Sequence, residues 1–318
     1  MNKNAIAVAI LFACAGMAQA QSNVSIYGVL DVGLIKGTGS TLQEGKGDFN
    51  RLGFKGTEDL GDGLKANFRL EMRFLPDTGT TEANGQRPLF QGRSWVGLSG
   101  GFGAIRFGRD MTAVQDAASD FDPFGFQTVG AIDAITGNYM SDTSTASSGN
   151  RFSNAAFYST PVMNGFQVNV SVATKEPLNG VPVVKSNPYS IATVYTGGPL
   201  AAMVGYERST NEDTFLSLNG SYKVGAANLM ASYSRFNRVL GVDERNWLVG
   251  ADIAVATGAI KVGYGQIKPQ GSGSDKQTSL GYWHTLSKRT MLYTDVSSRK
   301  PAAGSTNNTV DVGIHHTF

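Results

Sequence analysis

The chain of 318 residues is poor in cysteine, in long apolar runs and in clustered positive charge. Its one cysteine, Cys14, excludes a disulfide framework and a thiolate metal site. Beyond residue 20 no segment offers roughly 18 consecutive apolar residues, which excludes helical membrane spans. Lys and Arg number 27 against 25 Asp and Glu, without a basic run, so no nucleic-acid partner is expected.

Glycine and aromatic residues, in contrast, are abundant. The chain has 40 Gly against 10 Pro, together with 17 Phe and 11 Tyr. Because its net charge is low and its aromatic side chains are many, it can bury enough apolar surface to fold. Its average hydropathy resembles that of a soluble protein. A membrane barrel reaches the same average, however, because it combines a lipid-facing side with a wet interior.

Residues 1–20 predict a cleaved signal peptide. Lys3 gives a positive start, residues 5–13 form a short apolar core, and residues 18–20 (Ala-Gln-Ala) provide a small-x-small cleavage site. A lipoprotein signal at Cys14 is the alternative, although its flanking residues fit poorly. Cleavage leaves a mature chain without cysteine, so its stability does not come from disulfides.

Apolar and polar residues alternate through the rest of the chain. In residues 64–74 every second side chain is apolar, and those between include Arg69, Glu71 and Arg73. Successive side chains of a strand point to opposite faces, so this segment has one apolar and one charged face. The same pattern predicts about sixteen strands of roughly ten residues each. They begin near Val24, Phe49, Leu64, Phe90, Phe102, Arg151, Phe166, Tyr189, Ala201, Thr214, Ala227, Arg245, Ala259, Gln277, Arg289 and Thr309.

The connections between these strands alternate in length. Tight glycine-rich turns such as residues 59–63 and 100–101 separate long polar stretches such as 37–48 and 77–88. Short turns on one side, long loops on the other and an even strand number are typical of outer-membrane barrels. We therefore expect residues 21–318 to form an all-β, 16-stranded antiparallel transmembrane β-barrel with an aqueous lumen. A soluble β-sandwich or β-helix is the alternative.

Glycines lie inside many of the expected strands, and aromatic residues lie near strand ends. Interior glycine marks bends or close backbone approach, which a curved wall requires. Aromatic residues near strand ends are expected to form girdles at the two membrane interfaces. The candidates are Tyr27, Phe74, Phe90, Trp95, Tyr158, Tyr195, Tyr222, Trp247, Tyr264, Tyr282 and Phe318.

Several stretches resemble one family. Residues 25–31 (SIYGVLD), 51–61 (RLGFKGTEDLG) and 102–109 (FGAIRFGR), with the terminal Phe318, are similar to the general diffusion porins of Gram-negative bacteria, in their β-proteobacterial and neisserial branch. This resemblance covers the whole chain. It implies a homotrimer in the outer membrane, surrounded by lipid and lipopolysaccharide, with the third extracellular loop folded inward to narrow each pore. It also implies that Phe318 is an assembly signal for the outer-membrane assembly machinery.

Residues 110–150 form the expected constriction loop. The segment has no Lys or Arg, contains six aspartates, and is the third connection on the long side. A loop this long in a compact protein is either functional or disordered, and its aromatic residues favour packing. The family's inward loop often carries a Pro-Glu-Phe-Gly-Gly-like motif, to which residues 122–126 (Asp-Pro-Phe-Gly-Phe) are only similar. We expect three acids at the gap: Asp116, Asp120 and Asp122.

The wall expected to face this loop is basic. Six residues on the second to fifth strands share the polar, lumen-facing parity: Arg51, Lys55, Arg69, Arg73, Arg93 and Arg106. Neighbouring strands lie about 5 Å apart, so these charges would form one patch. Alternatively, Glu71 could satisfy its basic neighbours structurally. An acidic loop opposite a basic wall selects solutes by charge and, through its narrowness, by size. We expect a mild preference for anions.

No catalytic or metal-binding arrangement stands out. His315 and His316 are adjacent on an expected strand and therefore point to opposite faces. No nucleophile elbow, Walker loop or dinucleotide fingerprint occurs in a suitable context. We expect no catalytic residue, metal or cofactor, and predict a passive, water-filled outer-membrane porin for small hydrophilic solutes and ions. A substrate-selective channel, an outer-membrane barrel enzyme or adhesin, and a soluble secreted binding module are the alternatives.

Overall fold

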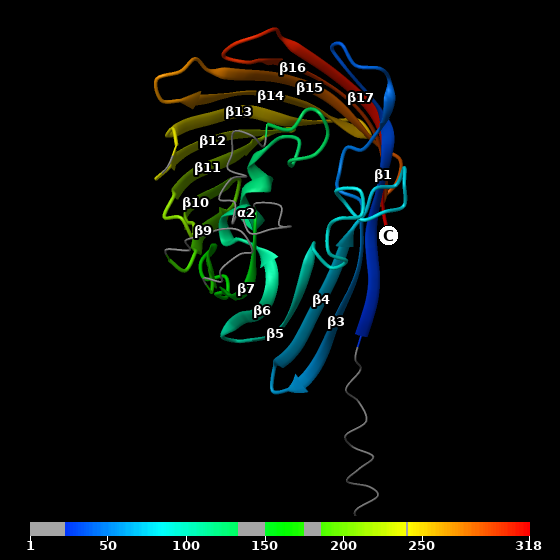
Figure 1. Ribbon diagram of the computed structural model, residues 1–318. Helices are drawn as coiled ribbons and strands as arrows, with labels where there is room; N and C mark the ends of the chain where they lie inside the picture. Colours follow the sequence, from blue (N-terminus) through cyan, green and yellow to red (C-terminus); the bar gives the residue numbers. More distant parts are fainter. Residues whose placement is uncertain (1–22, 133–149, 175–185, 240) are drawn as a thin grey trace, which may run out of the picture.

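The computed structural model describes residues 23–132, 150–174, 186–239 and 241–318. They form one antiparallel sheet that closes on itself, because β1 pairs with β17 over residues 29–37 and with β3 over residues 23–29 (Figure 1). The expected signal peptide lies outside the described residues, as do positions 133–149 of the expected constriction loop. No helix among the described residues is long and apolar enough to cross a membrane.

Sixteen long strands build the wall, and one short strand, β2, pairs with β1 at the rim of the barrel. Their bounds are β1 (Asn23–Gly37), β2 (Gln43–Gly45), β3 (Arg51–Gly61), β4 (Leu64–Arg73), β5 (Arg93–Gly100), β6 (Gly103–Met111), β7 (Arg151–Ser159), β8 (Phe166–Ala173), β9 (Tyr189–Gly197), β10 (Leu200–Arg208), β11 (Thr214–Val224), β12 (Ala227–Asn237), β13 (Glu244–Val255), β14 (Gly258–Pro269), β15 (Asp275–Thr285), β16 (Thr290–Lys300) and β17 (Asn307–Thr317).

The sixteen-stranded antiparallel barrel predicted from the sequence is confirmed. Each long strand begins at most three residues from its expected start. The short β2 was not expected; it pairs with the upper half of β1, where Ile35 lies opposite Gln43. The alternation of polar and apolar residues predicts the strands correctly because each strand has one face toward water and one apolar face. The period of two is therefore visible throughout the wall.

The two faces of the wall differ in chemistry and in exposure. Leu218 and Leu280 on the outer face are 42% and 51% exposed. Their preceding neighbours point inward, and Ser217 and Ser279 are almost completely buried there. Large apolar side chains that stand exposed along a whole surface indicate contact with a non-aqueous medium. The outer face is therefore built for lipid.

The interior is occupied in part by the connection after β6. It contains the helix α2 (Ala113–Ala118) and the 3₁₀ turn η1 (Ser119–Phe121), and it lies inside the barrel (Figure 1). Thr112 caps α2, since its hydroxyl accepts from the backbone N–H of Gln115 at 3.3 Å. The apolar side of this segment packs on β9 to β12 through Ala113, Val114, Ala118, Phe121, Ala192, Met203, Phe215 and Phe236. The loop is thus held against one side of the barrel.

Two strand glycines make room for this loop. A Cβ atom at Gly205 would lie 2.8 Å from Cγ2 of Val114 in α2. A Cβ atom at Gly250 would collide with the ring of Pro123. The expectation that interior glycines serve wall curvature is therefore incomplete, because these two let a second layer of chain approach the sheet.

Leu280→Arg tests the assignment of the outer face. The substitution is expected to lower the free energy of unfolding from a bilayer by about 2–4 kcal/mol, because it places a guanidinium in hydrocarbon. Denaturant titration of protein refolded into lipid vesicles, followed by tryptophan fluorescence, measures the change. Leu280→Ala removes the same apolar side chain without adding charge, and should cost less. Equal losses for the two variants would contradict a lipid-facing Leu280.

Candidate functional site

Cross-strand register places four basic residues of β3 and β4 in two rows on the inner wall. Arg51 lies opposite Arg73, and Lys55 lies opposite Arg69. Like charges directly opposite each other on an antiparallel pair are destabilising. The wall therefore needs anionic or polarisable partners nearby, and most of them lie in the row between these two.

Glu71 occupies that middle row. It lies opposite Gly53 on β3 and opposite Arg93 on β5. Its carboxylate is 2% exposed and accepts from Nη2 of Arg69 at 3.0 Å. Hydrogen bonds between ionised partners are stronger than neutral ones. Arg69 therefore has its counter-ion within the wall. This is the structural pairing of Glu71 with its basic neighbours that the sequence analysis gave as the alternative.

Tyr27 of β1 completes the same row. Its hydroxyl donates to Glu71 Oε2 at 2.9 Å and accepts from Arg69 Nε at 2.5 Å. Its ring lies 5.2 Å from Lys55 Nζ and 4.8 Å from the Arg69 guanidinium carbon, within reach of cation–π attraction. Tyr27 was expected in an interfacial girdle. That expectation is wrong, because Tyr27 lies opposite Gly53 on the lumen-facing parity.

Arg93 connects the basic wall to the loop. Its Nη1 donates to Asp110 Oδ1 at 2.5 Å, and its Nη2 donates to Asp116 Oδ1 at 2.8 Å. Arg106 Nε lies 3.3 Å from the second oxygen of Asp110. The Arg106 guanidinium also lies 5.4 Å from the ring of Trp95, which points into the lumen and not into a girdle. Two of the six basic residues are therefore neutralised where the loop begins.

The other three basic residues differ in how far they reach solvent. Arg51 pairs with Asp48 at 3.1 Å. Arg73 is 4% exposed, and its guanidinium lies 4.2 Å from the ring centroid of Phe49. Lys55 is exposed, and in the described part of the chain no carboxylate lies within ion-pair distance of it. Lys55 is thus the wall cation most available to a passing ion.

The loop is anchored on the far side of the barrel. Lys261 of β14 donates to the carbonyl oxygen of Pro123 at 2.6 Å. Gln277 of β15 donates to the carbonyl oxygen of Ala131 at 2.9 Å. Together with the packing of α2, these contacts hold the described part of the loop mainly against β9 to β15, and Thr128 N–H also donates to the carbonyl oxygen of Gly47 at 2.7 Å, ahead of β3 (Figure 1). Among the described residues, the basic rows of β3 and β4 therefore face the interior.

The three loop acids chosen from the sequence lie in different surroundings. Asp116 and Asp120 are exposed, and Asp116 is the one that pairs with the wall. Asp122 is 2% exposed, and its two oxygens accept from the backbone N–H groups of Phe124 at 2.7 Å and Ile132 at 2.9 Å. Its expected place at the gap is corrected: Asp122 fixes the turn of the loop, because docking of the neighbouring residues buries it.

Asp120 lies in η1, outside the wall. The surrounding protein desolvates the Asp120 carboxylate and, together with the nearby carboxylate of Asp116, raises the pKa of Asp120 above its usual range. The charge on Asp120 is therefore lost at a higher pH than that of an ordinary aspartate.

One buried residue beside the site has no distinctive signal in the sequence. Arg151 is 1% exposed; its Nε donates to the carbonyl oxygen of Gly92 at 2.6 Å, and its Nη1 donates to Asn150 Oδ1 at 2.6 Å. It lies near enough to Arg73 and Arg93 to interact with them electrostatically. A basic residue directly after an acidic loop is the one hint that could have identified it.

The last strand places its residues on the faces that alternation predicts. His315 points inward and hydrogen-bonds Asp31 at 3.0 Å, whereas His316 hydrogen-bonds Thr290 at 2.9 Å on the other face. Phe318 continues the pairing with β1, since it exchanges backbone hydrogen bonds of 3.1 and 3.2 Å with Gly28. Its side chain is 43% exposed at the short-turn end of the wall.

An apolar outer face, closed backbone pairing, a charged inner wall and a loop folded into the interior define an outer-membrane channel. The chain belongs to the Gram-negative porin family, whose sequence model matches residues 5–300. It is 32% identical to outer membrane porin protein 32 of Delftia acidovorans and 27% identical to an outer membrane porin protein of Bordetella pertussis, each over the full length of both chains.

Solved structures agree with this assignment. An anion-selective porin from Comamonas acidovorans superposes with a TM-score of 0.82 at 28% identity, covering 94% of this chain and 100% of that one. OmpT of Vibrio cholerae has a TM-score of 0.70 at 15% identity, covering 95% of this chain and 100% of that one, a likeness of fold alone. The predicted family, fold and outer-membrane location are confirmed.

Lys261→Met tests whether the loop is held by its contact with Pro123. The variant keeps the side-chain length but loses two charge-assisted hydrogen bonds, to the carbonyl oxygen of Pro123 and to Asp252 Oδ2, both at 2.6 Å and each worth about 1.5–3 kcal/mol. We expect a larger variance of the open-channel current in single-channel recordings, because the loop fluctuates more. Lys268→Met, an exposed change on the same strand, is the control and should leave the variance unchanged. An unchanged current variance in the Lys261 variant would show that the other contacts are enough to hold the loop in place.

Proposed function

We propose that the chain forms a water-filled channel through which small hydrophilic solutes and ions diffuse passively, with a preference for anions. No catalytic step is needed for this function. The observation that carries the proposal is the basic inner wall, whose rows on β3 and β4 are left open by the described part of the loop, which docks mainly on β9 to β15. The constriction would then select by size through the loop and by charge through the wall.

The charge balance at the wall favours anions. Among the described residues, the six basic side chains share four carboxylates, namely Asp48, Glu71, Asp110 and Asp116. The surplus is positive, and exposed Lys55 carries part of it without an ion-pair partner in the described chain. Asp116 is already paired with Arg93, which leaves Asp120 as the other exposed acid of the described loop that can oppose the wall. A positive gap lowers the energy of a passing anion relative to a cation.

The solved relative supports this reading. The structure from Comamonas acidovorans is that of an anion-selective porin, and it shares 28% of its residues with this chain. Arg also suits such a wall, since it keeps its charge when crowded by other cations. We extend anion selectivity to this chain on the basis of its own wall residues.

The proposed functional unit is a homotrimer inserted by the outer-membrane assembly machinery. Residues 1–20 would direct its export, and Phe318 would be the assembly signal, since its exposed ring lies over Gly28 on the outer face. An aromatic side chain at this edge is accessible to an assembly factor before the barrel closes. In the membrane the outer face would contact lipid and lipopolysaccharide.

Lys55→Gln is expected to weaken the anion preference. One unit charge about 7 Å from a permeating ion in water shifts the energies of chloride and potassium by about 0.6 kcal/mol in opposite directions. Salt at about 0.1 M screens this roughly by half, so the ratio of chloride to potassium permeability should change about threefold. Reversal potentials in a potassium chloride gradient across a planar bilayer measure this ratio. Lys223→Gln, an exposed change at the short-turn end of β11, is the control. Cation preference in the unmodified protein would refute the proposal.

Acidification is expected to strengthen the anion preference. The raised pKa of Asp120 means that its negative charge disappears as the pH falls through a range above that of an ordinary aspartate. The gap then becomes more positive, and the chloride-to-potassium ratio rises. Asp120→Asn should show a higher ratio at neutral pH and a smaller rise on acidification. An identical pH response in both proteins would remove Asp120 from the gap.

A further inference from the structure

The outer face of β12 to β16 carries charge of one sign at one end. Its charged residues are all basic and all lie at the strand ends next to the long connections: Arg235, Arg245, Lys268, Lys276 and Lys300. We call these five residues the outer basic belt. Every acid of the same five strands points inward: Glu244, Asp252, Asp275 and Asp295. The outer face of these strands thus carries positive charge alone, whereas the inner face carries both signs, since Lys261 and Arg299 also point inward.

The belt consists of two in-register groups. Arg235 lies opposite Arg245, and Arg245 lies opposite Lys268. Lys276 lies opposite Lys300. Directly opposed side chains on neighbouring strands stand about 5 Å apart at their Cβ atoms, and like charges there repel. Five cations placed in this way form a surface that an anion would stabilise.

The protein itself does not supply that anion among the described residues. All five side chains are exposed, and none forms an ion pair there. Arg235 donates its Nε to Asn237 Oδ1 at 2.8 Å, which leaves both terminal nitrogens available. Arg235, Arg245 and Lys268 line a groove of about 480 Å³, which holds one acid, Asp243. Three cations against one carboxylate leave the groove positive.

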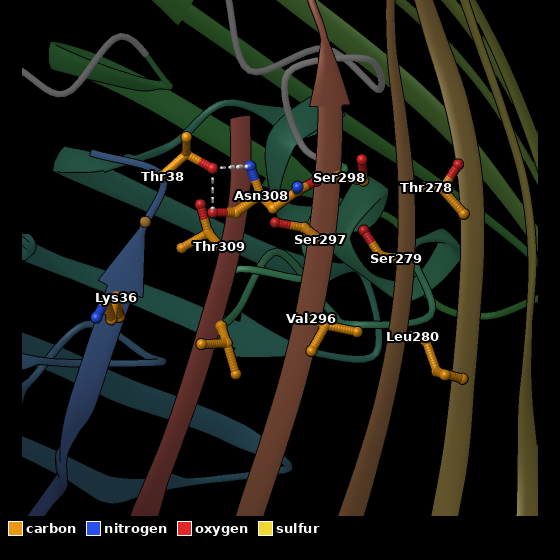
Figure 2. Close-up of a pocket in the computed structure, with 12 residues that line it drawn as sticks. Lys36, Thr38, Thr278, Ser279, Leu280, Val296, Ser297, Ser298, Asn308 and Thr309 are labelled. Carbon is orange, nitrogen blue, oxygen red and sulfur yellow. Dashed lines mark hydrogen bonds between the residues drawn. The ribbon is translucent and has the colours of Figure 1, made fainter. Parts of the chain in front are cut away.

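The belt lies at the edge of the lipid-facing band. Tyr233 and Trp247 stand opposite each other one outward position below Arg235 and Arg245, and the Trp247 and Tyr264 rings are 5.3 Å apart. Aromatic rings of this kind mark a membrane–water interface. Figure 2 shows the same boundary on β15 and β16, where Leu280 and Val296 give way to Thr278 and Ser298 toward the long loops. Lys276 and Lys300 follow directly.

We propose that the outer basic belt binds the phosphate groups of a phosphorylated glycolipid in the outer leaflet. Long loops are extracellular in barrels of this class, so the belt lies at the headgroup level of that leaflet. Guanidinium groups bind phosphate oxygens bidentately, and lysines add point charges beside them. The acyl chains would lie along the apolar residues below the aromatic row. This inference rests on the outer-membrane location and deepens the proposed lipid contact by assigning its residues.

The triple variant Arg235→Gln, Arg245→Gln, Lys268→Gln tests the belt. Native mass spectrometry of the purified protein, in EDTA so that no divalent cation forms a bridge, counts bound bisphosphorylated lipid A. We expect the affinity to fall at least about tenfold, because each basic residue near an anionic headgroup contributes a severalfold factor. Lys223→Gln, Lys288→Gln, Arg289→Gln removes equal charge at the short-turn end and should bind lipid A as the unmodified protein does.

Two further ligands, dephosphorylated lipid A and inorganic phosphate, show whether the belt recognises the phosphate groups of a lipid or free phosphate. Dephosphorylated lipid A should bind the unmodified protein as weakly as lipid A binds the belt variant. Equal binding of lipid A with and without phosphate, or equal loss in the short-turn control, would overturn the proposal. Inorganic phosphate that binds as tightly as lipid A would also overturn it. Single-channel conductance of the belt variant should match the unmodified protein, so that failure of the channel function is detected independently.

Discussion

Closure of the sheet is the constraint on which the rest of this molecule depends. Lipid offers no hydrogen-bond partner to a backbone, so a strand wall in a membrane must pair at every edge. Here β1 meets both β17 and β3, and Phe318 extends that pairing to the final residue. Once the wall is closed, alternation sorts every side chain to the lipid or to the lumen. The two functional surfaces follow from that sorting.

The inner wall shows how like charges are kept together. Its two basic rows would repel, yet the intervening row holds Glu71 and Tyr27, which bind Arg69, and Asp110 holds Arg93 and Arg106. The carboxylates neutralise only part of the positive charge of the wall. The charge that is left gives the lumen a positive potential, which attracts anions. The loop contributes Asp116 to this wall and otherwise docks on the opposite strands. Gly205 and Gly250 let it approach those strands, so its described part leaves the space beside β3 and β4 open.

Local pattern was enough to predict the strands and the inward parity of Arg51, Lys55, Arg69 and Arg73, because both depend only on alternation within a strand. The closed barrel was predicted from the even number of strands and the alternation of short and long connections. The local pattern did not predict the position of a side chain that depends on contacts with residues distant in the sequence. Asp122 is buried by contacts of its own loop with β13 and β14, and Tyr27 is drawn into a network with Glu71 of β4. The belt needed register as well, since only cross-strand pairing brings Arg235, Arg245 and Lys268 together.

An anion site beside the basic wall of the channel can be located by anomalous diffraction from crystals soaked in rubidium bromide, since the two ions are distinguished within one lattice. We expect bromide beside Lys55 and Arg51, within the space between the wall and the loop, and no rubidium there. Rubidium at the wall, or a loop folded over Lys55 in place of bromide, would refute an anion site at this wall.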